Sequence, residues 1–135
     1  MYENLGLAQD ALGQSGSAEE SLRRAVELAS GAWRPYFSYG AFLFRQGRAA
    51  DSLSALRQAL TLAPDAVDVR FELARVLYHQ DSLAEAVRIL KPALNSNQCR
   101  VHNLMARIYS AGGDTDQAAI EVQAMDHCRA AGERR

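Results

Sequence analysis

Apolar and small residues recur along the chain at the spacing of one face of an α-helix. In the stretch 36–43 they stand at i, i+3, i+4 and i+7, and the stretch 53–60 is also helical in its spacing. Gly47 lies between the two stretches, where one helix must stop and the chain must reverse. The pattern therefore predicts two antiparallel helices joined by a short turn.

This pattern extends over the whole chain and predicts four helix pairs. We expect helices over 2–14 and 17–30, 34–46 and 49–63, 66–80 and 83–94, and 99–112 and 115–130. No stretch carries a clear β-strand pattern. The predicted fold class is all-α.

Serine and proline residues mark the predicted boundaries. Ser17–Glu20 and Ser82–Glu85 have the form of capping boxes, in which the serine accepts a backbone N–H bond and the glutamate reaches back. Pro35 suits the first turn of a helix, and Pro64 marks a boundary between pairs. Pro92 falls inside the last helix of the third pair, where it should bend or end that helix.

The helix pairs are copies of one another in sequence. A shift of 34 residues places LRRAV at 22–26 on LRQAL at 56–60, and it places Phe37 on Phe71. A shift of 32 residues then continues the register into the last pair. Because small residues fall on small and large on large, we infer an internal repeat.

The units mostly have large residues at their positions 4, 7, 11 and 24 and small residues at 8, 20 and 27, although Met125 stands at position 27 of the fourth unit. In the second unit these are Tyr36, Tyr39, Leu43 and Leu56, and Gly40, Ser52 and Ala59. The pattern resembles the tetratricopeptide repeat over nearly the whole chain, with units at about 1–32, 33–66, 67–98 and 99–132. The resemblance implies a single domain, 1–135, built as a right-handed α–α superhelical solenoid with a concave inner face.

Both ends of the array depart from this pattern. Gln9 stands where an apolar residue is expected, so we expect the first unit to fray. The last unit ends at 133–135 without the polar capping helix that such arrays need. We therefore expect either further repeats in a longer protein or a second molecule on the last helix.

The resemblance also implies where a partner binds, because in this family positions 2, 5, 9, 12 and 13 of the first helices line the groove. In the third and fourth units these positions hold Asp68, Phe71, Arg75, Tyr78, His79, Arg100, Asn103, Arg107, Ser110 and Ala111. The predicted binding residues are Arg34, Phe37, Phe44, Arg45, Phe71, Arg75, Tyr78 and Arg107. Aromatic side chains beside arginines are typical of binding hot spots. The alternative is that each of these aromatic rings packs between helices instead of lining the groove.

We expect this groove to hold an extended or helical peptide, with arginines contacting an acidic side chain or a C-terminus. Chaperone adaptors of the family hold a carboxylate with Lys, Asn and Arg residues. The matching positions here are Glu3, Leu7, Ser38, Asp68 and Glu72. We therefore do not expect binding to chaperone tails.

Composition and charge argue against several kinds of partner. The chain has 135 residues, with 15 Lys and Arg against 16 Asp and Glu. A protein that binds nucleic acid usually carries a basic excess, so we expect no nucleic-acid partner. No apolar run approaches the roughly 20 residues of a membrane helix, so we expect no membrane partner. The three histidines are scattered and no catalytic or metal-binding motif is present, so we expect no cofactor, no metal site and no enzyme activity.

The chain has two cysteines, Cys99 and Cys128, which are too few for a disulfide scaffold and lack metal-ligand spacing. We expect two reduced thiols in a cytoplasmic protein. Positions 1 and 30 of a unit lie at the same end of an antiparallel pair, so a disulfide between them is geometrically feasible.

The favoured function is a protein–protein interaction module, an adaptor or scaffold that binds a protein or peptide in its groove. One alternative is a structural module that forms a homo-oligomer through its uncapped ends. Another is a non-catalytic targeting segment of a larger enzyme. Fold alone does not give function, so the identity of the partner stays open.

Overall fold

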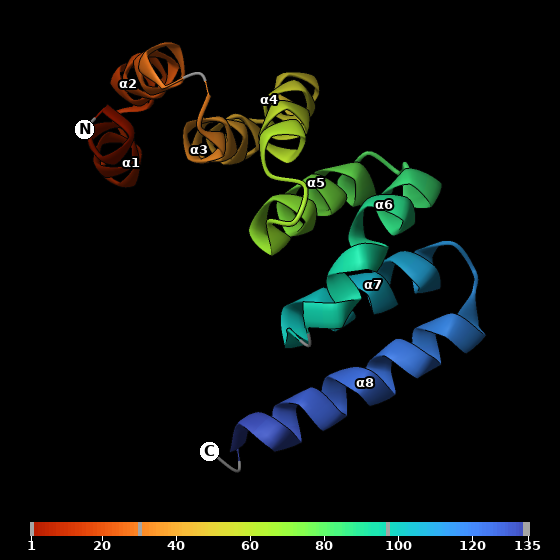
Figure 1. The fold of residues 1–135 in the computed structure, drawn as a ribbon. Helices are drawn as coiled ribbons and strands as arrows, with labels where there is room; N and C mark the ends of the chain where they lie inside the picture. Colours follow the sequence, from red (N-terminus) through yellow and green to blue (C-terminus); the bar gives the residue numbers. More distant parts are fainter. Residues whose placement is uncertain (1, 30, 97, 134–135) are drawn as a thin grey trace. The chain divides into compact units, whose positions relative to one another are not determined.

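The computed structural model describes residues 2–29, 31–96 and 98–133, which form eight α-helices and one 3₁₀ helix (Figure 1). The elements are α1 (Tyr2–Ala11), α2 (Ser15–Leu28), α3 (Trp33–Arg45), α4 (Ala49–Leu62), α5 (Val67–His79), α6 (Leu83–Leu90), η1 (Lys91–Ser96), α7 (Cys99–Ala111) and α8 (Thr115–Glu133). No β-strand occurs in these ranges, and the predicted all-α class is confirmed.

Helix boundaries follow the sequence repeat closely. Each helix begins and ends within three residues of its predicted range, with the exception of α6. This helix ends at Leu90, and the chain continues as η1 to Ser96 with Ala93 still buried. Pro92 accounts for the change, because it lacks an N–H group and its ring clashes with the preceding turn of an α-helix. The predicted effect of Pro92 is therefore confirmed.

The helices group into two compact units, each larger than one repeat: the first unit is Met1–Val69 and the second unit is Arg70–Arg135. In the first unit α1 packs on α2, α2 on α3, and α3 on α4. In the second unit α6 packs on α7 and α7 on α8, while Arg70 Nη1 donates to the Ile89 carbonyl at 2.8 Å and ties α5 to α6. Within each unit, helices thus contact mainly their neighbours in the sequence.

A residue in the left-handed region follows the first helix of every pair. These residues are Gly13, Gly47 and Gly113, with φ of 78°, 78° and 82°, and Asp81, with φ of 60°. In all four turns the next residue donates its N–H to the carbonyl five residues earlier, at 2.8–2.9 Å. Gly13, Gly47 and Asp81 follow one another at intervals of 34 residues, so the turn conformation repeats with the helices.

Small residues let the two helices of a pair approach closely. A Cβ atom at Gly40 would lie 2.7 Å from Leu56 Cγ, and one at Gly6 would lie 2.7 Å from Leu22 Cγ. Both leucines are fully buried, as is Leu90 one repeat later. A larger residue at either glycine would therefore force the paired helix to move.

Two polar contacts reinforce the first unit. Gln9 stands where the repeat pattern has an apolar residue, and its side chain accepts a hydrogen bond from Ser21 Oγ at 2.7 Å. Arg48 Nη1 lies 2.7 Å from Glu19 Oε1, between the turn after α3 and helix α2. The hydrogen bond from Arg48 and its charge hold the pKa of Glu19 below its ordinary value.

The predicted capping boxes are wrong. Helix α2 begins at Ser15, which places Ser17 inside the helix, and Ser82 makes no side-chain capping bond to α6. The residues before α2 and α6 have ψ of 64° and 65°. A capping residue usually has an extended backbone, whereas here the left-handed turn leads directly into the helix.

The turn at Asp81 is predicted to limit stability. Asp81→Gly should raise the free energy of unfolding by about 0.5–1 kcal/mol, because glycine adopts a positive φ without steric cost. Urea denaturation followed by circular dichroism would measure the change. Gly47→Ala is the matched control and should lower stability. A destabilised Asp81→Gly variant would contradict the assignment.

Candidate functional site

Four predicted binding residues of the second unit meet at one cavity. The cavity has a volume of about 300 Å³ and is lined by α5 and α7. Its described lining residues are Phe71, Arg75, Tyr78, His79, Arg100, Asn103, Leu104 and Arg107. We call it the arginine cavity.

Helical spacing brings these side chains together. The lining residues of α5 stand at i, i+4, i+7 and i+8, and those of α7 stand at i, i+3, i+4 and i+7, so each set shares one helix face. Other faces of both helices are packed, with Leu73, Leu77, Met105 and Ile108 almost fully buried. The core therefore fixes which way the lining faces point.

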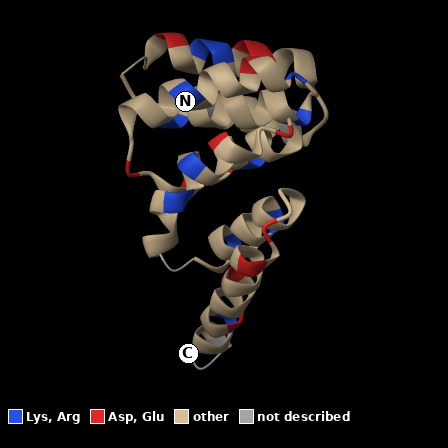
Figure 2. Cartoon of the chain, turned by 90° about the vertical axis from the view of Figure 1, so that its right-hand side faces the viewer, with Lys and Arg blue, Asp and Glu red and all other residues tan. Residues whose placement is uncertain are grey.

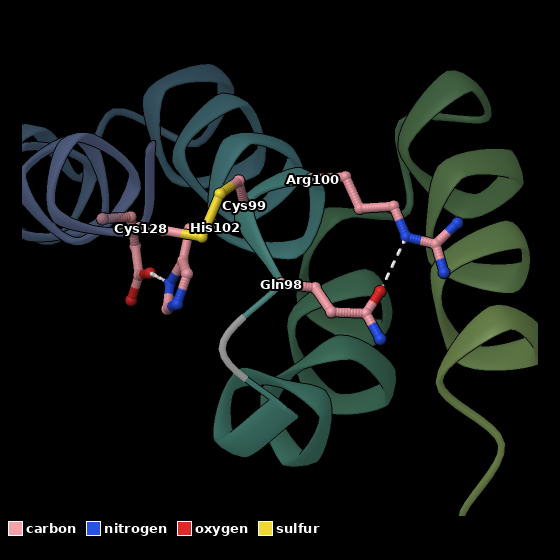
Figure 3. Close-up of a disulfide and its surroundings, with 6 residues drawn as sticks. Gln98, Cys99, Arg100, His102 and Cys128 are labelled. Carbon is pink, nitrogen blue, oxygen red and sulfur yellow. Dashed lines mark hydrogen bonds and ion pairs between the residues drawn. A yellow bond between two sulfur atoms is a disulfide. The ribbon is translucent and has the colours of Figure 1, made fainter. Parts of the chain in front are cut away.

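Three guanidinium groups give the arginine cavity a positive character. Arg100 Nε donates to Gln98 Oε1 at 2.9 Å (Figure 3). Arg100 Cζ also lies 4.8 Å from the centroid of the Phe71 ring, so two contacts orient this side chain. Arg75 Nη2 lies 2.8 Å from Glu72 Oε2, which offsets part of the charge. None of the described lining residues is acidic. This arrangement favours a carboxylate or phosphate group.

A second cavity adjoins the first. It has a volume of about 620 Å³ and shares Tyr78, Asn103 and Arg107 with the arginine cavity. Its other described lining residues are mostly small, and they are Ala106, Ser110, Ala111, Thr115, Ala118, Ala119 and Val122. We call it the alanine cavity. The shared residues place a positively charged site beside a largely apolar one.

The predicted binding residues of the first unit lie on α3. Phe37 and Phe44 are half-buried, whereas Arg34 and Arg45 are exposed. The rings of Trp33 and Phe37 meet edge to face with centroids 5.9 Å apart, and Arg34 Cζ lies 5.7 Å from the Trp33 centroid. Helix α3 therefore carries an aromatic and arginine cluster of its own.

Sequence reasoning did not single out two residues that shape these sites. Trp33 contacts both the Arg34 guanidinium and the edge of the Phe37 ring, and its signal was that it is the only tryptophan of the chain. Gln98 orients Arg100 from outside the helix, and no sequence signal marked it. The binding role of the eight predicted residues stays a prediction.

The two cysteines form a disulfide, so the expectation of two reduced thiols is wrong. The sulfur atoms of Cys99 and Cys128 are 2.02 Å apart and the Cα atoms are 5.5 Å apart (Figure 3). Cys99 is the first residue of α7, and Cys128 lies near the end of α8. The antiparallel packing of these helices brings the cysteines to the same end of the pair.

A buried polar pair also links α7 to α8. His102 Nδ1 and Glu121 Oε2 are 2.7 Å apart, and their side chains are 10% and 9% exposed. Burial raises the pKa of the nearby Tyr109 hydroxyl, and the carboxylates of Glu121 and Asp114 raise it further. The last pair thus combines a covalent bond with a buried hydrogen bond.

Acidic and basic positions are interspersed along the helices (Figure 2). Over the described ranges, no group of three or more His, Cys, Asp or Glu side chains is arranged to hold a metal ion. Among the helices formed by these residues, none is both long enough and apolar enough to cross a membrane.

Comparisons with known families and structures identify a repeat fold. Two profiles described as tetratricopeptide repeat match residues 3–66 and 43–108. A comparison with curated proteins finds no match.

Several solved structures share the fold. A crystal structure of MamA is 18% identical, with a TM-score of 0.90 over 99% of this chain and 80% of that chain. The structure called MamA MSR-1 C2 is 21% identical, with a TM-score of 0.84 over 97% of this chain and 76% of that chain. MamA 41-end from Desulfovibrio magneticus RS-1 is 16% identical, with a TM-score of 0.84 over 94% and 73%. At such identities the likeness shows a shared helical solenoid fold alone.

The disulfide is predicted to stabilise the second unit. The cysteines are 29 residues apart, so removing the bond by a Cys99→Ser, Cys128→Ser double substitution should cost about 3–4 kcal/mol by the loop-closure argument. Urea denaturation with and without reductant would measure this. Reductant should shift the midpoint of the parent protein and leave the double variant unchanged. An unshifted parent protein would contradict a stabilising disulfide.

Proposed function

The chain belongs to the tetratricopeptide repeat family, and on that premise we propose that it is a non-catalytic adaptor or scaffold module that binds a segment of another protein. The bound segment lies against the first helices of the repeats. A targeting segment of a larger enzyme would use the same surface. The arginine cavity on α5 and α7 is the observation that carries this proposal.

The chemistry of the arginine cavity indicates an acidic partner. Arginine binds a carboxylate through two parallel hydrogen bonds, and Arg100 is already oriented by Phe71 and Gln98. Arg107 is exposed and lines both cavities, so it is placed to contact a bound segment over its length. We infer that the site takes an acidic side chain or a C-terminal carboxylate.

The adjoining alanine cavity adds a second requirement. Its small residues and Val122 leave room for an apolar side chain, and Tyr78 stands at its boundary with the arginine cavity. Burial of an apolar group contributes about 25 cal/mol per Å² of area removed from water. The preferred segment therefore has an acidic group next to an apolar residue.

The cluster on α3 is proposed as a further contact of the same kind. Arg34, Phe37, Phe44 and Arg45 combine charge with half-buried aromatic surface, as Arg75 and Phe71 do in the second unit. Alanine substitution at Phe37 and at Phe71, each tested alone, would show which unit contributes to binding.

The disulfide is informative about the cellular compartment in which the protein works. The expected cytoplasmic location stays a prediction, and the Cys99–Cys128 bond speaks against it because cytosolic thiols are generally kept reduced. Counting thiols by alkylation, in protein taken from its source cells without reductant, would distinguish a reduced from an oxidising environment.

Substitution of Arg107 tests the groove. Peptides that bind the parent protein would first be selected from a displayed library with random sequence and exposed C-termini. Arg107→Ala should weaken their binding about 10-fold or more, because a hydrogen bond to a charged group contributes about 1.5–3 kcal/mol. Isothermal titration calorimetry would measure the dissociation constants.

Arg88→Ala is the matched control for this experiment. Arg88 lies on α6 in the same unit, is 68% exposed and pairs with Glu85 outside both cavities. The Arg88→Ala variant therefore removes one positive charge, as Arg107→Ala does, but away from the cavities. Its binding should match that of the parent protein. Equal weakening by the two variants would reject a specific arginine cavity.

Self-association is a second candidate function, and exposed apolar residues at both ends favour it. Leu5 and Leu12 of the first pair are 47% and 75% exposed, and Ile120 and Val122 of α8 are 54% and 42% exposed. Such residues favour contact with a further repeat or another copy.

Light scattering over a wide range of protein concentration would test self-association. The mass should rise with concentration, and Ile120→Glu should suppress the rise by placing a charge in the contact. A monomer at every concentration would exclude this candidate.

A further inference from the structure

The Cys99–Cys128 disulfide lies in the wall of an open cavity, and peptide binding in the groove does not use it. This cavity has a volume of about 620 Å³ and is lined by Gln98, Cys99, His102, Ala124, His127, Cys128, Ala131 and Gly132. Both cysteines are half-buried rather than enclosed in the core. The disulfide-bonded residues therefore form part of the wall of this cavity, and the cavity volume lies in the range of small-molecule sites.

The polar groups around the disulfide can hold such a molecule. His102 and His127 line the cavity and supply hydrogen-bonding groups. His102 Nδ1 lies 2.7 Å from Glu121 Oε2, so Nε2 is the ring nitrogen left to contact a bound molecule (Figure 3). The cavity therefore combines a disulfide with side chains that can form hydrogen bonds.

The two sulfur atoms differ in how well they carry negative charge. Cys99 is the first residue of α7, a helix of 13 residues, where backbone N–H groups and the positive end of the helix dipole favour an anion. Cys128 lies five residues before the end of α8, away from any helix N-terminus, so no comparable stabilisation acts there. A thiolate is thus better stabilised at Cys99, which makes Cys99 the better leaving group.

We propose that this disulfide is a thiol-exchange site. An incoming thiolate attacks Cys128 Sγ and forms a new S–S bond with it. The Cys99–Cys128 bond breaks, and Cys99 Sγ leaves with the electron pair as a thiolate. One thiolate enters and one is released, so this step needs no oxidant.

A second thiolate completes the reduction of the protein. It attacks the incoming group's sulfur in the mixed disulfide and releases Cys128 as a thiolate. Two thiols are thereby oxidised to one disulfide, while the protein disulfide is reduced to two thiols. The attacking thiol comes from a small amino-acid-derived thiol or from an exposed cysteine of another protein.

Exchange opens one tie of a helix that packs along α7 but has few buried side chains. In α8 only Glu121, among its described side chains, is buried, and Arg129 follows Cys128 on the exposed surface. Opening the disulfide removes the covalent link between the end of α8 and the start of α7. Exchange should therefore loosen this end of α8 while the first unit stays folded.

Reaction with glutathione tests the proposal directly. The folded protein, purified without reductant, is incubated with reduced glutathione, quenched with acid and analysed by intact mass and peptide mapping. We expect a single glutathione adduct on Cys128 and an alkylatable thiol on Cys99. A parallel reaction with reduced thioredoxin distinguishes a protein thiol as the source, because it yields the dithiol protein faster than glutathione does at equal thiol concentration.

Several results would overturn the proposal. They are two alkylatable thiols in the protein before treatment, an adduct found on Cys99 instead, or a disulfide that resists both reductants until the protein is denatured. In single variants, Cys128→Ser should react with oxidised glutathione about threefold faster at neutral pH than Cys99→Ser, owing to the larger thiolate fraction at Cys99. Equal rates would contradict the assignment of the leaving group.

Limited proteolysis provides a second readout. Glutathione treatment should accelerate tryptic cleavage after Arg129 several-fold and leave cleavage after Arg57, in α4 of the other unit, unchanged. Unchanged cleavage after Arg129 would show that α8 is held without the disulfide. Equal acceleration at both arginines would indicate general unfolding and would count against a local exchange site.

Discussion

The close approach of the two helices in each pair is the contact on which the rest of the structure depends. Where Gly40 faces Leu56, an added Cβ would lie 2.7 Å from the leucine side chain, and the same relation joins Gly6 to Leu22. A single pair of helices cannot bury its apolar surface alone, so each pair must pack against the neighbouring pair. In the first two pairs, a small residue opposite a buried leucine therefore keeps the paired helices close and makes stacking of neighbouring pairs necessary.

The same contact leaves part of each first helix available for binding. In α5 and α7 the residues at the same repeat position are Ala74 and Ala106, and both are buried. The next residue in each helix is an arginine, Arg75 or Arg107, and it turns toward the arginine cavity. The alanine is buried in the packing, whereas the exposed Arg107 beside Ala106 keeps its charge at the surface, where a partner can contact it. Binding chemistry and folding are thus assigned to neighbouring residues of one helix.

Features set by local pattern could be predicted, and features set by contacts between elements could not. Helix ranges and the break at Pro92 follow from spacing and backbone chemistry, and the shared face of Phe71 and its neighbours follows from helical periodicity. Capping at Ser82 failed because the preceding turn, rather than the serine, decides the backbone angle there. The orientation of Arg100 depends on residues outside its own helix. For Cys99–Cys128 the geometry of the pair was recognisable, but the argument from the reducing cytosol outweighed it.

The last helix shows how a repeat can be held without a large apolar core. Most side chains of α8 are exposed, and its ties to α7 include the buried His102–Glu121 hydrogen bond and the disulfide near its end. Apolar packing responds to temperature and denaturant, whereas a hydrogen bond between ionisable groups and an S–S bond also respond to specific chemistry. Val122 of this helix lines the alanine cavity beside the arginine cavity. The position of α8 therefore connects the chemistry of the disulfide to the shape of the surface on which a partner would rest.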